Sequence, residues 1–215
     1  MMTIETYDSG LLHSNMYVIT ENNHAIVIDP CLNTEPGNNR IIDWIILTHE
    51  HYDHISGVNA WKKETKGTVL CSKACADRLG DPRKTLARIF PEFCQLQTWF
   101  PLDSIPQTDT EYRSEADQTF DNKLTISWEG HEIRLTETPG HSPGSAIILL
   151  DNQYLFSGDT LFEDRPIELR FPGGNAKKWK ERSEIIINQL PDGLQVFPGH
   201  FGTFILNGHQ RRKEG

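Results

Sequence analysis

The stretch Thr48-His49-Glu50-His51-Tyr52-Asp53-His54 places three histidines and an aspartate within seven consecutive positions, directly after the apolar run Ile45–Leu47. On an extended stretch, alternate side chains point the same way, so the first two histidines can bind one metal ion. The aspartate and the last histidine lie beyond a turn and can reach a second ion. The spacing therefore predicts a paired metal site at the end of a buried strand.

A helical zinc-protease site is the main competing interpretation of a histidine-rich stretch of this kind. That motif requires His-Glu-x-x-His, with its two histidines four positions apart on one helical face. The residue four positions after His49 is Asp53, not a histidine. The metalloprotease interpretation is therefore excluded.

Three further donor residues stand at the ends of predicted strands, and each directly follows a glycine: His141, Asp159 and His200. Glycine lets the backbone approach a site closely. The predicted site has three donors on one ion, three on the other and one between them, with room for a bridging water or hydroxide. These groups are, in that order, His49, His51 and His141; Asp53, His54 and His200; and Asp159.

The other histidines lack such partners in the sequence. They are His13, His24, His131 and His209. A single histidine is more often a hydrogen-bonded or solvated structural residue than a metal ligand. We therefore expect structural or surface roles for these four, with His13 placed just before a strand that can edge the pocket.

Bulk composition limits the class of protein. A chain of 215 residues with 37% hydrophobic and 24% charged residues can bury one core, so a single domain over residues 1–215 is expected. The net charge of −9 disfavours a nucleic-acid partner, because such binding depends on cationic side chains that displace counterions. No secretory signal and no membrane-length apolar run is present. We therefore expect a cytoplasmic protein that does not bind membranes.

Short apolar or alternating runs between clusters of Asn, Gly and Pro predict two strand-rich halves. The predicted strands are 15–20, 25–29, 44–48 and 68–72 in the first half, then 123–128, 132–138, 146–150, 154–157 and 194–197. Helical segments are expected at 56–65 and 73–93, and Asn175 is expected to cap another helix. Residues 98–122 show little periodicity and predict an exposed connection or lid. This pattern fits an α/β protein, a four-layer αββα sandwich.

The chain resembles the metallo-β-lactamase superfamily and, within it, the branch of glyoxalase II and its small relatives. The resemblance follows the family's order over almost the whole chain. The matching segments are Ser14-Asn15, Ile28–Pro30, Thr48–Gly57, Thr138–Ser145, Ser157–Phe162, Phe171–Asn175 and Pro198–His200. The resemblance implies the metallo-β-lactamase fold and a dinuclear metal site.

Ligand identity narrows the branch. Typical zinc β-lactamases have arginine at the place of His54 or lack an aspartate at the place of Asp159, so antibiotic hydrolysis is disfavoured. Diiron flavoproteins of this fold usually have glutamate at the place of His51 and carry a flavin domain, so they are excluded as well. The sequence keeps the donors of the glyoxalase II branch.

Three departures from the glyoxalase II pattern bear on the substrate. Glu168 and Arg170 stand where the family has an arginine and an aspartate, so the charges are exchanged, which favours a reversed salt bridge over a rebuilt substrate wall. Phe201 stands where a glycine commonly follows the last histidine. Only residues 202–215 follow that motif, which disfavours glutathione thioesters because no counterpart of the family's C-terminal helical domain is seen.

The predicted chemistry is hydrolysis by a hydroxide that bridges two divalent ions, zinc foremost, with iron or manganese as alternatives. Such cations lower the pKa of water from 15.7 to ~7. The resemblance implies that Asp53 is catalytic and holds or accepts the proton. Thr48 and Ser142 are predicted to orient imidazoles.

The expected substrate is a small to medium acyl thioester, with a lactone or another activated ester as alternatives. The expected pocket walls are Thr98–Asn122, Lys73–Phe93 and Glu163–Arg170. A mononuclear iron persulfide dioxygenase is the runner-up, because it resembles the same motifs and uses part of the ligand set. A non-catalytic metal-binding module and a nuclease are less favoured.

Overall fold

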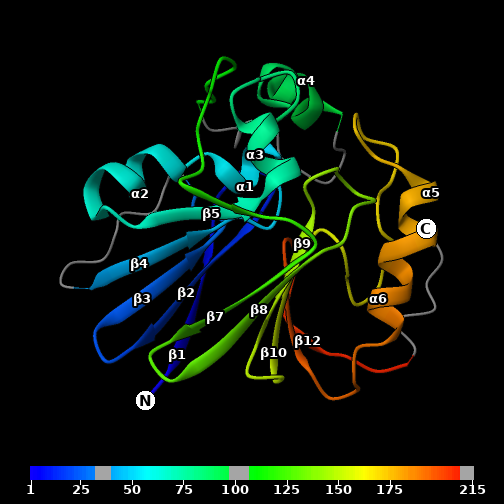
Figure 1. Ribbon diagram of the computed structural model, residues 1–215. Coiled ribbons are helices and arrows are strands. Elements are labelled where there is room, and N and C mark those ends of the chain that lie inside the picture. Colours follow the sequence, from blue (N-terminus) through cyan, green and yellow to red (C-terminus); the bar gives the residue numbers. More distant parts are fainter. Residues whose placement is uncertain (32–39, 97–106, 209–215) are drawn as a thin grey trace.

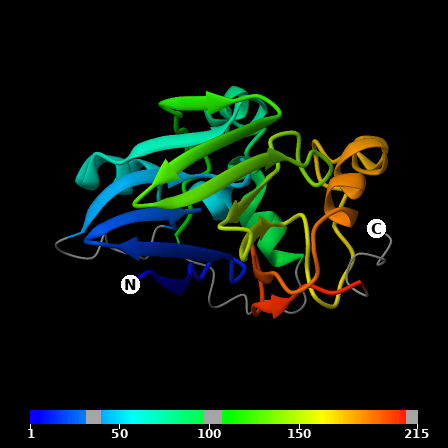
Figure 2. The same cartoon turned by 60° about the horizontal axis from the view of Figure 1, so that its bottom comes forward.

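The computed structural model describes residues 1–31, 40–96 and 107–208. Within these ranges, two six-stranded sheets pack face to face, and helices cover the outer side of each sheet (Figure 1, Figure 2). This arrangement confirms the predicted four-layer αββα sandwich. Within the same ranges, no helix is both long and apolar enough to cross a membrane.

The first sheet follows the order of the chain, with β1 at one edge and β6 at the other. Its strands are β1 (Thr3–Asp8), β2 (Asn15–Glu21), β3 (His24–Ile28), β4 (Ile41–Ile46), β5 (Thr68–Ser72) and β6 (Gln118–Phe120). The first three strands are antiparallel, and β3 to β6 run parallel. The sequence did not predict β1 or β6, because β1 is a largely polar edge strand and β6 has only three residues.

The second sheet takes up the second half of the chain in the order β12-β11-β10-β9-β8-β7. Its strands are β7 (Lys123–Trp128), β8 (His131–Glu137), β9 (Ala146–Leu150), β10 (Tyr154–Gly158), β11 (Gln195–Pro198) and β12 (Phe204–Ile205). Strands β7 to β10 form the predicted antiparallel meander, and β11 joins β10 in parallel. The ends of β10 and β11 therefore meet at one edge of the sheet.

The helices of the first half differ from the prediction, which placed them at 56–65 and 73–93. They are α1 (Tyr52–Ile55), α2 (Val58–Thr65), α3 (Lys73–Leu79) and α4 (Phe90–Gln95). The continuous helix expected over 73–93 is wrong, because α3 ends at Leu79 with Gly80 as its C-cap, and Pro82 lies in the turn that follows. The Ser72 side chain accepts a hydrogen bond from Cys75 N at 3.1 Å and fixes the start of α3.

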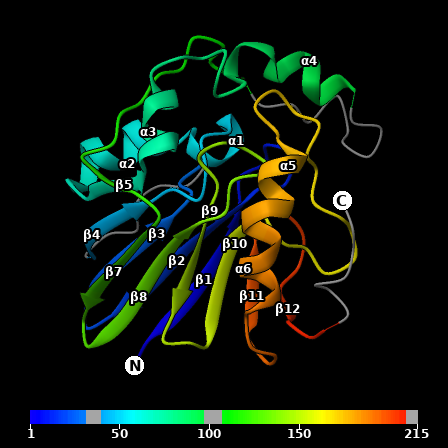
Figure 3. The ribbon, with the colours of Figure 1, turned by 45° about the vertical axis from the view of Figure 1, so that its right-hand side comes forward.

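The helix of the second half begins where the sequence predicts. Asn175 Oδ1 accepts from Lys178 N at 2.9 Å, as expected for an N-cap. Helix α5 (Ala176–Lys178) passes through a π-helical turn at Trp179–Ser183 into α6 (Glu184–Asn188). Figure 3 shows this segment lying along the outer side of the second sheet, near β10 and β11.

Three apolar layers stabilise the sandwich, and alternate side chains of a strand face different layers. In β4, Ile45 faces the layer shared with Trp61 of α2, whereas Ile46 faces the layer between the sheets. In β10, Phe156 faces the inner layer and Leu155 packs on the side of α5 and α6. Successive residues alternate between faces, so short apolar strands supply two cores at once.

Candidate metal centre

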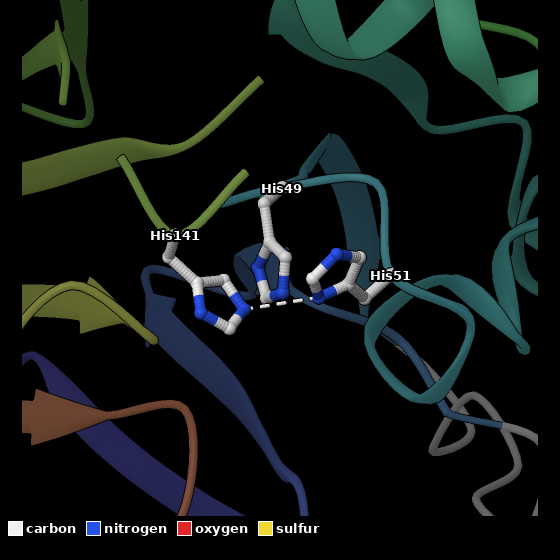
Figure 4. Close-up of side chains that lie close together, drawn as sticks. All are labelled: His49, His51 and His141. Atoms are coloured by element: carbon white, nitrogen blue, oxygen red, sulfur yellow. Dashed lines mark hydrogen bonds between the residues drawn. The ribbon is translucent and has the colours of Figure 1, made fainter. Parts of the chain in front are cut away.

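The first donor cluster consists of His49, His51 and His141. The first two lie in the loop after β4, and the third lies in the loop before β9. Figure 4 shows the three rings turned toward one another, with His141 Nε2 3.0 Å from His51 Nδ1. All three side chains are buried, and one donor atom of each lies within 4.8 Å of the others.

The second donor cluster consists of Asp53, His54 and His200. Helix α1 carries the first two, and His200 lies two residues after the end of β11. His54 Nε2 lies 3.3 Å from His200 Nε2, and His200 Nε2 lies 3.4 Å from Asp53 Oδ2. The His200 ring is fixed from behind, because its Nδ1 donates to the carbonyl of Leu12 at 3.0 Å.

Asp159 lies between the two clusters. Its Oδ2 is 3.4 Å from His141 Nε2 in the first cluster and 3.4 Å from His200 Nε2 in the second. Its Oδ1 is 3.5 Å from His54 Nε2. The structure thus brings together all seven residues that the sequence selected, in the grouping that the sequence predicted.

The donor atoms fit divalent cations. Two ligands bound at about 2.0–2.1 Å to a tetrahedral ion lie about 3.3 Å apart, which matches the 3.3 and 3.4 Å separations in the second cluster. His49 Nε2 and Asp159 Oδ1 are buried without a hydrogen-bond partner. A buried polar atom of this kind is costly unless something pairs with it, and a cation would pair with both.

Asp29 supports both the ligand loop and the second cluster. It sits at the end of β3 with φ +53°, a left-handed backbone that aspartate tolerates. Its carboxylate accepts from Thr48 N at 2.7 Å, from Thr48 Oγ1 at 2.6 Å and from His54 Nδ1 at 3.1 Å. Thr48 Oγ1 also lies 3.0 Å from His49 Nδ1, as its predicted orienting role requires. The sequence placed Asp29 in a matching segment without giving it a role.

The expectation that Ser142 orients an imidazole is wrong. Its hydroxyl instead donates to Glu50 Oε2 at 2.9 Å, and Gly144 N donates to the same oxygen at 3.2 Å. Glu50 therefore fastens the first ligand loop to the loop that carries His141. The His141 ring is oriented by a backbone group, because its Nδ1 donates to the Glu168 carbonyl at 2.9 Å.

Two glycines next to donors are required by close approach. A Cβ on Gly199 would collide with Asp159 Oδ1 and lie 2.9 Å from His54 Cε1. Gly158 has φ +49°, and a Cβ there would lie 2.5 Å from Thr48 Oγ1. These positions explain why glycine precedes a predicted ligand at the ends of β10 and β11.

The two clusters differ in charge. Burial lowers the pKa of His49 well below its usual value and that of His51 to about 3, and neighbouring histidines act in the same direction. Burial also lowers the pKa of His54 and His200, but the carboxylates of Asp53 and Asp159 outweigh it, so both pKa values are raised. The first cluster thus offers neutral imidazoles, and the second is built from ion pairs.

A cavity of about 330 Å³ opens above the donors. Five phenylalanines supply much of its wall: Phe90, Phe93, Phe162, Phe171 and Phe201. The predicted walls Lys73–Phe93 and Glu163–Arg170 both contribute. Residues 107–122 of the third predicted wall do not line it, and 98–106 lie outside the described residues. Tyr112 instead packs behind the site, where its hydroxyl donates to the Ile55 carbonyl at 2.9 Å.

The sequence that builds this arrangement matches a known protein family. Residues 9–200 match the family described as the Metallo-beta-lactamase superfamily. The chain belongs to the metallo-beta-lactamase superfamily. This membership, together with donor clusters of histidine and aspartate, indicates a metal-dependent hydrolase that uses divalent ions.

Relatives within the superfamily point toward the glyoxalase II group. Glyoxylase B2 of Dictyostelium discoideum is 29% identical over 163 residues, which cover 74% of the chain and 49% of that protein. Hydroxyacylglutathione hydrolase of Aeromonas hydrophila is 29% identical over 191 residues, which cover 86% of the chain and 60% of that protein. The chain thus spans about half to three fifths of these relatives.

Solved structures of the superfamily share the fold. The protein TTHA1623, solved in a di-iron-bound form, superposes with a TM-score of 0.69 at 22% identity and covers 98% of both chains. At this identity the likeness concerns the fold alone.

The departures from the superfamily pattern have structural counterparts. Glu168 and Arg170 pair with each other, with Arg170 Nη2 2.6 Å from Glu168 Oε2, so the exchanged charges form a local ion pair.

Three of the four remaining histidines lie beside an aspartate, as expected for structural roles. These pairs are His13–Asp8, His24–Asp43 and His131–Asp151. His209 lies outside the described residues.

Proposed function

We propose that this chain hydrolyses an acyl thioester with the aid of two divalent ions, zinc being the expected metal. The observation that carries the proposal is the position of Asp159, which faces one cluster with Oδ2 and the other with both oxygens, at the floor of an apolar cavity. A carboxylate can bridge two ions, whereas an imidazole nitrogen serves one. The seven residues would hold the ions as predicted: His49, His51, His141, Asp53, His54, His200 and Asp159.

Cations held by these residues would lower the pKa of a bound water from about 15.7 to about 7 and would polarise the carbonyl of the substrate. The chain itself supplies an ionised carboxylate. Burial raises the pKa of Asp53, but the charges of His54 and His200 outweigh it, so the pKa is lowered. Asp53 also lines the cavity. Its carboxylate is therefore placed to accept the proton of the attacking water.

The leaving group follows from the acids that the cavity holds. Among the described lining residues, Glu168 is the only acid outside the donor set. Its hydrogen bonds from Arg170 lower its pKa to about 2, so it cannot donate a proton near neutral pH. The proton at hand for the leaving group is then the one that Asp53 has taken from the water, so a group that can depart without full protonation is favoured. A thiol, with a pKa of about 8.5, does so far more readily than an alcohol or an amine.

The test is a set of hexanoyl substrates that differ only in the leaving atom: a thioester, the matching oxygen ester and the matching amide. With protein reconstituted with zinc, iron or manganese, we expect the thioester to have the highest kcat/KM and the amide to be inert. Elemental analysis of the same sample should approach two metal equivalents.

A different outcome would identify the runner-up. One equivalent of iron, together with oxygen consumption on a persulfide and no thioester turnover, would replace this proposal by the mononuclear dioxygenase. Preferential hydrolysis of a lactone would keep the dinuclear chemistry and change the substrate.

A further inference from the structure

Phe201 adopts a backbone conformation that phenylalanine rarely takes. It directly follows His200 and has φ +68°, in the left-handed region that favours glycine. The conformation is held in place by Asn15, whose Nδ2 donates to the Phe201 carbonyl at 2.8 Å and to the Pro198 carbonyl at 3.0 Å. A strained residue beside a metal ligand suggests a function for its side chain.

The Phe201 ring forms a platform at the mouth of the cavity. It contacts Phe162 edge to face, with ring centroids 5.9 Å apart. The guanidinium of Arg165 lies over it, with Cζ 3.6 Å from the ring centroid. A cation–π contact of this kind favours one position of the guanidinium, whose N–H groups can still act as hydrogen-bond donors.

Among the described residues that line the cavity, Arg165 is the only lysine or arginine. Among the described residues, no carboxylate forms an ion pair with it, whereas the acid in the same wall, Glu168, is already paired with Arg170. A planar guanidinium with free N–H donors matches a carboxylate in a two-point contact. The mouth of the cavity therefore offers a site for an anion.

The two sides of the cavity differ in polarity, as the two donor clusters do. Phe171 packs against His141 with centroids 5.7 Å apart and against Phe93 at 5.0 Å, so the side of the first cluster is apolar. His200 of the second cluster adjoins Phe201, at 6.0 Å, and hence Arg165. A bound thioester would place its apolar acyl chain on the first side and its thiol part on the second.

We propose that Arg165, held on Phe201, binds a carboxylate on the thiol part of the substrate. The substrate class is then an apolar acyl thioester of a carboxylate-bearing thiol. This inference rests on the proposed function for the placing of the thioester, but the contact itself is one of binding and can be measured without turnover.

The experiment uses two non-hydrolysable probes, the 2-oxoheptyl thioethers of 3-mercaptopropionate and of 3-mercaptopropionamide, which differ only in the charge of one end. Calorimetric titration of the metal-loaded chain should give a Kd for the carboxylate probe about tenfold or more below that for the carboxamide. In Arg165→Gln the Kd values for the two probes should differ by no more than about twofold. Arg134→Gln, which removes an exposed arginine paired with Glu132 on β8, is the control and should keep it.

The variant Phe201→Gly distinguishes the role of the aromatic ring in binding from an effect on the stability of the fold. Glycine adopts φ +68° without strain, so the variant should melt at or above the temperature of the parent chain. It should nevertheless lose most of the preference for the carboxylate probe, because the guanidinium is no longer held.

The inference is overturned if the parent chain binds both probes equally, or if Arg165→Gln keeps the preference. Failure of the hexanoyl thioester to be hydrolysed, with the binding preference intact, would count against the proposed function alone.

Discussion

The two donor clusters are assembled from the same kinds of side chain but are prepared for a metal in different ways. His49, His51 and His141 are buried among one another, and burial keeps them neutral. His54 and His200 instead lie against Asp53 and Asp159, whose charges favour the protonated imidazole. The first cluster can bind an ion without releasing protons, because its imidazoles are already neutral. The second cluster must release protons when it binds an ion.

The two halves of the proposed dinuclear site are therefore not equivalent. A neutral three-histidine cluster suits an ion that stays bound, whereas a charged cluster binds in competition with protons. Asp159 couples the halves because it touches both. The comparison gives three predictions, beginning with the residue that the halves share.

Asp159→Asn should have the largest effect. The change keeps size and shape but removes the negative charge that offsets two adjacent cations, so paired metal binding should weaken. Hydrolysis of the thioester should fall by at least the ~10 to 100-fold seen for changes that only support a ligand, and we expect a larger loss for a residue between the clusters. Turnover, metal content and circular dichroism are measured together.

Asp121→Asn, an exposed change in the turn between β6 and β7, is the control and should be neutral. Near-normal rates with two bound metals in Asp159→Asn would contradict the bridging role.

Asp29→Asn should affect the second cluster more than the first. The neutral amide weakens the hydrogen bond from His54 Nδ1 while tolerating the left-handed backbone at this position. Loss of such support should lower the affinity for the second ion by ~10 to 100-fold. Competition with a metal-binding dye gives both affinities. Asp43→Asn, which removes the carboxylate beside His24 2.9 Å away on the same sheet, should leave both unchanged. Equal losses at both ions would show that Asp29 acts on the fold.

Acidification should remove the two ions in sequence. The pKa values of His54 and His200 are raised, so protons compete for them at a higher pH than the usual 6.5. The pKa values of the first cluster are lowered, so its imidazoles remain available below that pH. As pH falls, bound metal should drop from two equivalents to one, and only later to none. Dialysis at a series of pH values followed by elemental analysis shows the plateau. Simultaneous loss of both ions would remove the distinction between the clusters.

The sequence predicted the donor set because metal ligands are marked by residue type and by their place after strands. His49 to His54 stand in one stretch, and the glycines before Asp159 and His200 mark a close approach that the structure contains. Strands with continuous apolar runs, such as β9, were predicted with their true ends because both faces are buried.

What the sequence did not predict depends on contacts between distant residues. The roles of Glu50 and Asp29 come from partners in other loops, which no local pattern shows. The edge strand β1 lacks an apolar run of its own and is fixed by pairing with β2. The break between α3 and α4 is visible as Gly80 and Pro82, and the continuous helix was predicted despite them.

The bridge between Ser14 and His200 has a consequence for the order of folding. Asn15 N donates to the Gly199 carbonyl at 2.7 Å, so the last donor is positioned by residues near the start of the chain. During synthesis the stretch from His49 to His54 emerges long before its partners, and it can chelate a cation early but only partially. The complete centre requires both sheets, because its donors come from both halves of the chain.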